Sequence, residues 1–391
     1  MNTQKLGTLA VHAGEDEVLE VPSVNVPVYL STTYRFADAA AAEAYLDDPR
    51  GKWLYSRLEN PTVLAAERKL AALEGAEAAL CFASGMAAVT AALLAVLKQG
   101  DLLLVSDALY GESLRLCRDV LAKFGVEVRS APIAGLAQAV EEAPSNARAL
   151  LFETPANPMA RVADVPAVAN ACRRRGLTSI LDATFATPVN LRPLSYGVDL
   201  VLHSATKYLN GHSDHLAGVV AGGKALVAEV EKVRRSTGAN LDPAVAYDLV
   251  RGVKTLEVRV LRQNETALQV ARALEGHPKV ARVSYPMLPS HPDHALAKRL
   301  LRGGGGVLAF SAKGGYEAIC RVHDALRIVA RASSLGGVES LASIPVISSH
   351  RHATHAELAA AGIDRGTLRL SVGLEDPEDL VADLLQALER A

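Results

Sequence analysis

The stretch that decides the fold is Val201-Leu202-His203-Ser204-Ala205-Thr206-Lys207-Tyr208, where an apolar strand pattern runs into small hydroxyl residues and a lysine. A second strand-like stretch earlier in the chain, Ser179-Ile180-Leu181-Asp182, ends in a carboxylate. Parallel strands of one sheet place their carboxyl ends at a common edge, where ligands bind. The two stretches therefore predict one site that contains Lys207, Asp182 and the hydroxyls of Ser204 and Thr206.

These residue types fit the binding of pyridoxal phosphate. A lysine amine forms the Schiff base, small hydroxyl residues hold the phosphate, and a carboxylate keeps the pyridine nitrogen protonated. A surface lysine after a strand and an aspartate at a helix start would be the simpler interpretation of either residue alone. The conjunction of all of them favours the cofactor.

From Thr62 onward, short apolar runs alternate with helical patterns. Residues 63–73 have helical spacing, with Thr62 as the expected N-cap and Gly75 beyond the end. Further helices are expected at 86–97 and 166–175. Strands are expected at 79–83, 102–106, 149–153, 178–182, 200–203 and 217–221. This alternation predicts an α/β fold with a mainly parallel sheet covered on both faces. Ser84 and Glu153 then also fall at the ligand-binding edge.

The chain divides into three expected parts. Residues 1–61, rich in Pro, Ser and Thr, predict an irregular, extended N-terminal arm, and residues 62–245 predict the large domain. Residues 246–391 predict a smaller C-terminal α+β domain, with a long helix at 246–274, a strand at 367–372 and a terminal helix at 377–388. The run Gly303-Gly304-Gly305-Gly306 lacks a phosphate-binding motif and predicts a loop or a strand-edge bulge.

Two further segments fit a phosphate. At Ser84-Gly85-Met86 a strand turns into a helix, whose first backbone amides can bind an anion. Tyr55 and Arg57 are two residues apart in the arm, so in an extended chain both point to one side, and arginine binds phosphate bidentately.

Composition argues for a soluble globular chain with small-molecule partners. The chain has 391 residues, half of them hydrophobic, and a net charge of −2. No block of like charge favours nucleic acid or an anionic membrane, and no apolar run is long enough for a membrane span. The start of the chain lacks a signal-peptide pattern, so the cytoplasm is expected. Four widely spaced cysteines predict free thiols, and no metal site is expected.

Taken together, the motifs resemble the Cys/Met-metabolism family of pyridoxal phosphate enzymes, over almost the whole chain. The family includes cystathionine γ-synthases and γ-lyases, methionine γ-lyases and homoserine-ester sulfhydrylases. The motifs that carry the resemblance are Tyr55-Ser56-Arg57 with Asn60-Pro61-Thr62, Ser84-Gly85-Met86, Leu109-Tyr110-Gly111, Glu153-Thr154-Pro155 with Asn157-Pro158, Asp182, Ser204-Ala205-Thr206-Lys207, Ser334-Leu335-Gly336-Gly337 with Glu339-Ser340-Leu341, and Arg369-Leu370-Ser371-Val372-Gly373.

The resemblance implies a fold-type I pyridoxal phosphate transferase and a role for each matching residue. Lys207 would form the Schiff base and move protons, and Asp182 would hold the pyridinium nitrogen. Tyr110 would stack on the ring, and Asn157 would contact the ring oxygen and the substrate. Cofactor contacts are implied for Ser84, Gly85, Met86, Ser204 and Thr206, with Tyr55 and Arg57 from a neighbouring subunit. Substrate contacts are implied for Ser334, Glu339 and Arg369. The resemblance also implies a homodimer with shared sites, in most members a tetramer.

Three positions depart from the family pattern. Leu54 stands where cystathionine enzymes have an acid, Glu112 where methionine γ-lyases have a cysteine, and Ala183 where asparagine is common. Glu112 either replaces the missing acid or starts a helix, and the latter is the simpler interpretation. The histidines of His350-Arg351-His352 and His355 are expected in a loop near the substrate entrance.

The expected reaction is γ-elimination or γ-replacement on a sulfur amino acid, of the cystathionine γ-lyase or γ-synthase type. A homoserine-ester sulfhydrylase and a methionine or homocysteine γ-lyase remain alternatives within the family. An aminotransferase and a regulatory protein that only binds pyridoxal phosphate are alternatives of other classes.

Overall fold

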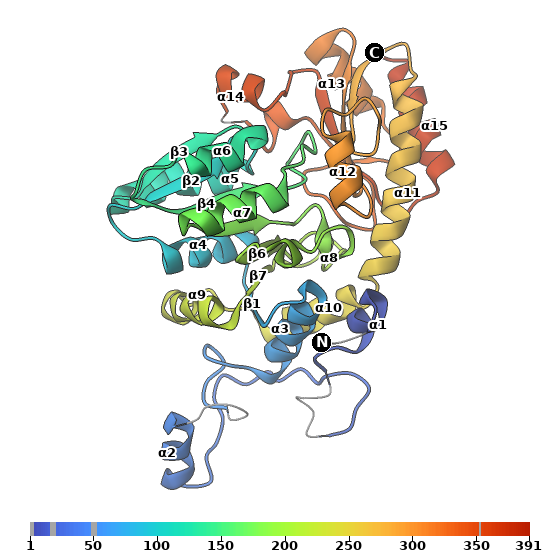
Figure 1. Ribbon diagram of the computed structural model, residues 1–391. Helices are drawn as coiled ribbons and strands as arrows, with labels where there is room; N and C mark the ends of the chain where they lie inside the picture. Colours follow the sequence, from blue (N-terminus) through green and yellow to red (C-terminus); the bar gives the residue numbers. More distant parts are fainter. Residues whose placement is uncertain (1–3, 16–20, 48–52, 352) are drawn as a thin grey trace.

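The computed structural model describes residues 4–15, 21–47, 53–351 and 353–391. Figure 1 shows a body built around two sheets, with an N-terminal arm that lies below it. Within the described residues no helix is long and apolar enough to cross a membrane. All four cysteines are free, and three of them are buried.

The first sheet has seven strands in the order β1-β7-β6-β5-β4-β2-β3. Only β7 runs antiparallel to its neighbours, so the expected mainly parallel sheet is present. The strands are β1 (Ala78–Phe82), β2 (Leu102–Ser106), β3 (Glu127–Ala131), β4 (Ala147–Glu153), β5 (Thr178–Asp182), β6 (Leu200–Ser204) and β7 (Gly218–Gly222). Asp182 of β5 pairs with Leu202 of β6, which brings the carboxylate next to the strand that leads to Lys207.

Helices cover both faces of this sheet with apolar side chains. One face packs against α4 (Gly85–Val96) and α9 (Lys224–Thr237), the other against α6 (Leu136–Glu141) and α7 (Val165–Arg175). At the β7 side, α3 (Pro61–Glu74) and α10 (Pro243–Val253) close the core. Short helices α5 (Gly111–Arg115) and α8 (Thr187–Asn190) lie between these elements along the chain, and α12 (His294–Leu300) follows them and precedes residue 307, where the second sheet continues.

The N-cap of α3 is Asn60, not Thr62 as expected. The Asn60 side chain accepts hydrogen bonds from the N–H groups of Thr62 and Val63. Pro61 occupies the first helical position, where its missing N–H costs nothing. Gly75, with φ 69°, then ends the helix in the left-handed conformation.

The second sheet has five strands in the order β10-β11-β12-β9-β8. These are β8 (Val280–Ser284), β9 (Val307–Ala312), β10 (Ala330–Arg331), β11 (Leu341–Ser343) and β12 (Thr367–Ser371), of which the sequence predicted only β12. Helices α11 (Leu256–Glu275), α13 (Gly315–Ala325) and α15 (Pro377–Leu388) pack on it around one apolar core. The glycine run at 303–306 is a loop before β9, as expected.

The single long helix expected at 246–274 is wrong, because α10 ends at Val253 and α11 begins at Leu256. At the break, the buried guanidinium of Arg259 donates hydrogen bonds to the carbonyls of Gly252 and Tyr208, both at 2.8 Å. The Arg259 side chain thus supplies hydrogen bonds to carbonyls that receive none from a continuous helix. The expected boundary between residues 245 and 246 falls within α10.

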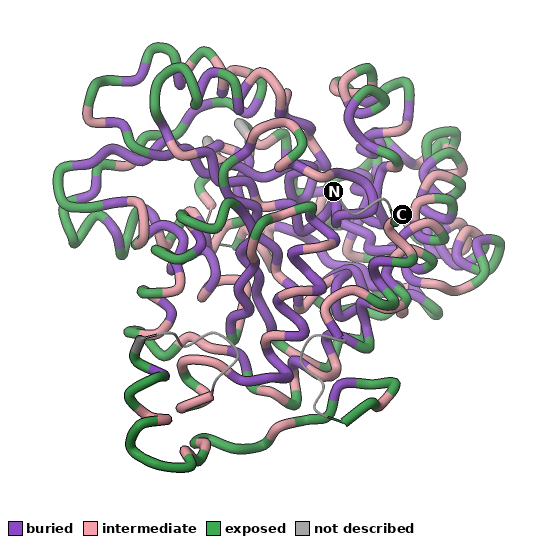
Figure 2. Tube along the Cα trace, turned by 60° about the horizontal axis from the view of Figure 1, so that its bottom comes forward, coloured by how far each residue is buried: buried purple, intermediate pink, exposed green. Residues whose placement is uncertain are grey.

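The arm is less irregular than expected. It contains α1 (Leu6–His12), whose Leu9 and Ala10 are buried against the core near α3, and α2 (Ala39–Asp47). Much of the arm is exposed, as Figure 2 shows: Val24, between the two helices, is 94% exposed, and Leu46, within α2, is 78% exposed. In Figure 1, α2 stands apart from both sheets.

Candidate active site

The candidate site is a cavity of ≈ 570 Å³ whose lining comes from the carboxyl ends of β4, β5 and β6 and from the region of the second sheet. Eleven of the residues predicted from the sequence line it: Ser84, Gly85, Met86, Tyr110, Asn157, Asp182, Ser204, Thr206, Lys207, Ser334 and Arg369. Tyr55, Arg57 and Glu339 do not line it. The lining combines residues that are far apart in the sequence, as expected when the carboxyl ends of parallel strands share one edge of a sheet.

One end of the cavity is suited to an anion. Ser84 is the N-cap of α4 and accepts a hydrogen bond from the N–H of Ala87 at 3.1 Å. A Cβ at Gly85 would lie 2.8 Å from the Cβ of Ser204, so only glycine allows this close approach. The first N–H groups of a helix have no partner inside the helix and favour negative charge. The start of α4 and the hydroxyl of Ser204 therefore form a cradle that suits an anion such as phosphate.

Thr206 also lines the cavity, but its hydroxyl is engaged elsewhere. It donates to the carbonyl of Ala217 at 3.2 Å and accepts from the N–H of Ala217 at 3.0 Å. A phosphate contact from Thr206 requires the hydroxyl proton to turn away from Ala217.

Lys207 and Arg369 meet at Ser334. The Lys207 Nζ donates to Ser334 Oγ at 2.8 Å, and Arg369 Nη2 donates to the Ser334 carbonyl at 2.7 Å. Ser334 has a φ of 106°, a conformation that non-glycine residues rarely adopt and that costs about 1–3 kcal/mol. The strained backbone thus presents a hydroxyl to the lysine and a carbonyl to the arginine.

Both cations are perturbed by their surroundings. Burial, with a smaller contribution from the positive charge of Arg369, lowers the pKa of Lys207 to about 8. A substantial share of neutral, nucleophilic amine is therefore present near neutral pH. Arg369 donates through Nη1 to Asn157 Oδ1 at 3.2 Å, while its buried Nε has no hydrogen-bond partner among the described residues. A substrate carboxylate would satisfy it.

Asp182 is held by Thr184, two residues further along. Its Oδ1 accepts from the Thr184 N–H at 2.9 Å and from the Thr184 hydroxyl at 2.5 Å. Burial raises the pKa of Asp182, and the two Thr184 hydrogen bonds oppose this. Thr184 therefore orients the carboxylate although Ala183 offers no polar side chain. The Asp-x-Thr spacing is a known local turn pattern and could have indicated Thr184 from the sequence.

Glu153 has a structural role that the sequence did not reveal. Its carboxylate is buried and accepts from the N–H of Tyr110 at 2.9 Å and from the N–H of Asn157 at 2.8 Å. Burial and the neighbouring Asp182, its partner across the β4–β5 pair, raise the pKa of Glu153. One carboxyl group thus fixes the backbone positions of both residues expected to contact the cofactor ring.

Tyr55 and Arg57 are exposed and lie outside the cavity lining. Arg57 Nη1 donates to the carbonyl of Arg235 at 3.0 Å, and the guanidinium carbon lies 5.6 Å from the centre of the Tyr55 ring. Tyr55 is 42% exposed. The two residues therefore do not reach the cavity of their own chain.

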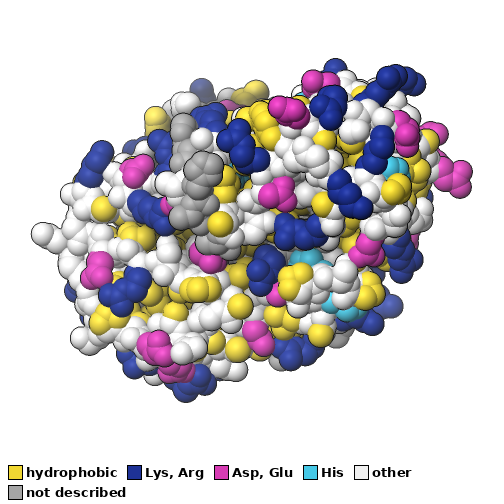
Figure 3. All heavy atoms as spheres, turned by 90° about the horizontal axis from the view of Figure 1, so that it is seen from above, with side chains coloured by type: hydrophobic (Ala, Val, Ile, Leu, Met, Phe, Trp, Pro, Cys, Tyr) yellow, Lys and Arg dark blue, Asp and Glu magenta, His cyan; other side chains and the backbone are white. Residues whose placement is uncertain are grey.

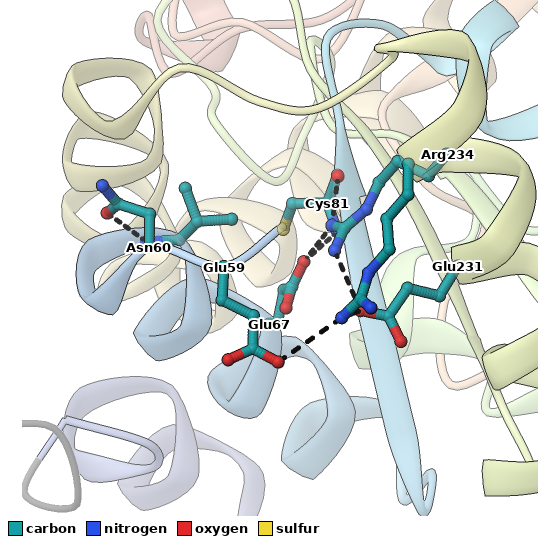
Figure 4. A network of polar contacts seen from close by, with 8 residues as sticks. Glu59, Asn60, Glu67, Cys81, Glu231 and Arg234 are labelled. Atoms are coloured by element: carbon teal, nitrogen blue, oxygen red, sulfur yellow. Dashed lines mark hydrogen bonds and ion pairs between the residues drawn. The ribbon is translucent and has the colours of Figure 1, made fainter. Parts of the chain in front are cut away.

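A polar network fixes the arm next to these residues, as Figure 4 shows. Glu59 pairs with Arg235 at 3.5 Å, and Arg235 also pairs with Glu231 of α9 at 2.8 Å. Beside them the buried Arg234 pairs with Glu67 of α3 and donates to the carbonyl of Cys81 in β1 at 3.0 Å. The network ties the end of the arm to α3, β1 and α9.

The side chain of Glu339 makes its contact with a residue outside the cavity lining. It accepts a hydrogen bond from the hydroxyl of Ser213 and does not line the cavity. Its role in substrate binding stays a prediction. Glu112 is in the first turn of α5, which agrees with its interpretation as a helix-start residue. It also lines the cavity.

The histidine segment is only partly the loop that was expected, because His350 and Arg351 lie in a turn but His355 begins α14 (His355–Ala360), with Thr354 as its N-cap. Ser349 and Arg351 line the cavity, and burial and Arg369 lower the pKa of His350 to about 4. His352 lies outside the described residues. Among the described part of the chain, no cluster of His, Cys, Asp or Glu has the arrangement of a metal site.

The cavity fits pyridoxal phosphate by its own geometry. The glycine-lined cradle at α4 suits the phosphate, Asp182 suits the pyridinium nitrogen, and Lys207 offers the amine. The comparison with known sequences agrees, because residues 7–389 match the family described as Cys/Met metabolism PLP-dependent enzyme. The chain belongs to this family. It is accordingly a pyridoxal phosphate enzyme.

Relatives within the family carry out different reactions. The chain is 42% identical over 385 residues to L-methionine gamma-lyase of Pseudomonas putida, covering 98% of this chain and 96% of the relative. It is 41% identical over 388 residues to cystathionine gamma-synthase 1, chloroplastic, of Arabidopsis thaliana, covering 98% and 69%.

A solved structure supports the same assignment of fold. A putative O-acetylhomoserine (thiol)-lyase of Campylobacter jejuni superposes with a TM-score of 0.94 at 32% identity, covering 99% of this chain and 100% of that chain. That protein carries N'-pyridoxyl-lysine-5'-monophosphate at its position 205. The fold-type I expectation is therefore confirmed.

Proposed function

We propose that this protein catalyses γ-elimination or γ-replacement on amino acids derived from homoserine or homocysteine, as a cystathionine γ-lyase or γ-synthase. The observation that carries the proposal is the convergence of Lys207, Asp182 and Arg369 on one cavity. The relatives named above support it, because the reactions in their names all act on sulfur amino acids or homoserine derivatives.

Bound pyridoxal phosphate would supply an electron sink for negative charge that develops on the substrate carbons. Asp182, oriented by Thr184, would keep the proton on the ring nitrogen. Arg369 would bind the α-carboxylate of the substrate through a bidentate contact. Its hydrogen bonds to Ser334 and Asn157 hold the guanidinium in place for this.

Lys207 would act as the base at the substrate α-carbon. Its lowered pKa leaves the amine partly neutral at physiological pH, and the hydroxyl of Ser334, 2.8 Å away, orients it. The same amine can carry the proton onward, so that the γ-substituent leaves. Tyr110, held by Glu153, lines the same cavity and would cover the ring.

Elimination would release a thiol, 2-oxobutanoate and ammonia, whereas replacement would add a thiol such as cysteine at the γ-carbon. A panel of cystathionine, homocysteine, methionine and acylated homoserines, each with and without cysteine, separates these outcomes when products are resolved by mass. Amino transfer is detected in parallel as glutamate formed from 2-oxoglutarate. If glutamate is the main product, or if no γ-product forms from any substrate, the proposal is wrong.

The active site would be shared between two subunits. Tyr55 and Arg57 lie outside their own cavity, in an arm that projects from the body and exposes apolar side chains such as Val24 and Leu30. We infer a homodimer in which this segment supplies the phosphate contacts of the neighbouring site, and a tetramer made of two such dimers. The cytoplasm is the location proposed.

Subunit complementation tests the shared site. Arg57→Ala subunits and Lys207→Ala subunits should each be nearly inactive, and mixing them under exchange conditions should restore activity. The mixture forms some sites in which an intact arm covers an intact lysine. The shared site is refuted if no activity is recovered although subunit exchange is demonstrated, or if sedimentation shows a fully active monomer. Tyr55 and Arg57 would then serve only the packing of their own chain.

A further inference from the structure

Arg259 is a cation buried behind the active site. Figure 3 shows arginine and lysine side chains on the surface of one face of the molecule, whereas Arg259 is only 4% exposed. Arginine is rarely buried unless it is paired. Burial alone lowers the pKa of Arg259 to about 10, with no neighbouring carboxylate to oppose it within the part of the chain that the structure describes. Neutral acceptors must therefore satisfy its N–H groups.

These acceptors are main-chain carbonyls of two separate segments. From the first turn of α11, Arg259 Nη1 donates to the Tyr208 carbonyl at 2.8 Å. Nη2 donates to the carbonyls of Gly252 at 2.8 Å and Leu209 at 3.4 Å. Gly252 belongs to the last turn of α10, and the other two residues directly follow Lys207. Arg259 thus joins the break between the two helices to the loop that carries the reactive lysine.

The loop after Lys207 is shaped around this guanidinium. The Lys207 carbonyl accepts a hydrogen bond from the N–H of Gly211 at 2.8 Å. Gly211 has a φ of 79°, and a Cβ at this position would clash with the guanidinium of Arg259. A glycine allows both the left-handed conformation and the close approach. The turn that starts at Lys207 therefore depends on contact with Arg259.

Gln263 makes a similar contact one turn further along α11. It lies four residues after Arg259, so both side chains leave the helix on the same side. Gln263 is fully buried, and its Nε2 donates to the carbonyls of Gly337 at 2.8 Å and Val372 at 3.1 Å. Gly337 belongs to the segment that begins at Ser334. One side of α11 therefore holds both the lysine loop and the serine segment.

Tyr208 packs the two segments against each other. A Cβ at Gly336 would lie 2.8 Å from the Tyr208 nitrogen and 2.9 Å from its ring, so the segment after Ser334 lies directly on this residue. The Tyr208 hydroxyl also accepts a hydrogen bond from the N–H of Gly306 at 3.1 Å. A shift of either segment would therefore change the distance between the Lys207 amine and the Ser334 hydroxyl.

We propose that Arg259 and Gln263 are positioning residues that align the Lys207 amine with the Ser334 hydroxyl. Arg259 fixes the lysine side of this 2.8 Å hydrogen bond, and Gln263 fixes the serine side. The proposal rests on the role of Lys207 in the proposed function, and it extends that role to a helix whose two residues do not line the cavity. In the alternative, both residues only stabilise the fold.

Capture of pyridoxal phosphate by the apoenzyme separates positioning from charge. The capture rate, followed by stopped-flow absorbance as a function of pH, reaches a plateau once the Lys207 amine is neutral. The midpoint of the profile reports the pKa of the amine, and the plateau reports its orientation. Arg259→Lys and Gln263→Leu should each lower the plateau about 10-fold, since each removes a contact that orients the reacting groups. The midpoint should stay unchanged, because burial and Arg369 set that pKa.

A double-mutant cycle with Ser334→Ala tests whether the effect passes through the serine hydroxyl. Contacts that act through one hydrogen bond are not additive. In the Ser334→Ala background, Arg259→Lys and Gln263→Leu should therefore lower the plateau by no more than about 2-fold further. If Arg259 and Gln263 only stabilise the fold, each substitution would have the same effect in both backgrounds.

A matched control comes from a glutamine of the same domain. Gln386 on α15 donates through Nε2 to the carbonyls of Ala325 at 2.8 Å and Asp383 at 3.0 Å, outside the cavity lining. Gln386→Leu removes the same kind of contact as Gln263→Leu and should leave the plateau unchanged. Circular dichroism and thermal unfolding identify folded variants. If Gln263→Leu does not fold, the cycle with Arg259→Lys, which keeps the positive charge, decides.

The proposal is overturned if the plateau is unchanged in the folded variants of Arg259 and Gln263. It is also overturned if the plateau falls by the same factor with and without the Ser334 hydroxyl, or if Gln386→Leu lowers it as much. Capture requires no amino-acid substrate. A holoenzyme that forms no γ-products would refute the proposed function, while the plateau rates would still decide whether α11 positions the lysine.

Discussion

The lowered pKa of Lys207 predicts how fast the apoenzyme captures its cofactor at each pH. Capture requires the neutral amine. At pH 7 an amine of pKa 8 is about 10% neutral, whereas a lysine of ordinary pKa is about 0.03% neutral. With the pKa of Lys207 at about 8, the fraction of reactive amine is about 300-fold larger. The capture rate should rise with pH and level off above about 8.

Removing Arg369 changes this profile in a defined direction. Burial is the larger cause of the lowered pKa and the charge of Arg369 is the smaller one. Arg369→Gln should therefore move the midpoint upward but keep it below the ordinary lysine value. As a matched control, Arg365→Gln removes an arginine that lies over the ring of Tyr316, outside the cavity lining, and should leave the midpoint unchanged.

Stopped-flow absorbance of apoenzyme mixed with pyridoxal phosphate, from pH 6.5 to 10.5, measures the profile. The same reaction with Nα-acetyl-lysine in identical buffers corrects for titration of the cofactor itself. A midpoint near 10.5 for the wild-type protein would contradict the reasoning, because it would mean that neither burial nor Arg369 acts on the amine. An unchanged midpoint in Arg369→Gln would show that the charge of Arg369 does not contribute to the lowered pKa of Lys207.

Three further variants test the site. Lys207→Ala should abolish turnover and the visible absorbance of the protein-bound cofactor, and a surviving Schiff base to protein would disprove the lysine assignment. Asp182→Asn should retain much of the cofactor yet lower kcat about 100-fold or more, because a neutral partner cannot hold the ring proton; near-normal kcat would refute that role. Glu153→Gln should turn an amide NH2 toward a backbone N–H, which costs about 1–3 kcal/mol of stability. It should also alter the visible circular dichroism of the cofactor, and an unchanged signal would show that Glu153 does not position Tyr110 and Asn157.

The sequence determined the parts of the structure that depend on neighbours in the chain. Strand β2 is apolar up to its last residue, and β5 has the buried Ile180 and Leu181 at its centre, because both faces of a covered sheet are buried; the bounds of both could therefore be predicted. Lys207 and Asp182 could be placed at one edge because each follows such a strand. The bounds of α15 followed from Pro377 and its helical pattern.

Other elements gave weak or neglected local signals. β3 (Glu127–Ala131) is an edge strand with mostly exposed side chains, so it has no apolar run to detect. The alanine-rich stretch of α2 has high helix propensity, which the prediction of an irregular arm overlooked. The break between α10 and α11 depends on Arg259, which reaches carbonyls of a distant loop as well as Gly252.

Only the tertiary structure decided which side chains share the cavity. Lys207 and Ser334 are 127 positions apart and Asn157 and Arg369 are 212 apart, yet each pair is joined by a hydrogen bond. The strand and helix periods of the sequence specify which face of an element is buried, but not which distant residue it meets. The contacts of Glu153, and the close approach of Gly111 to the carbonyl oxygen of Ser349, depend on how two sheets and their loops pack together.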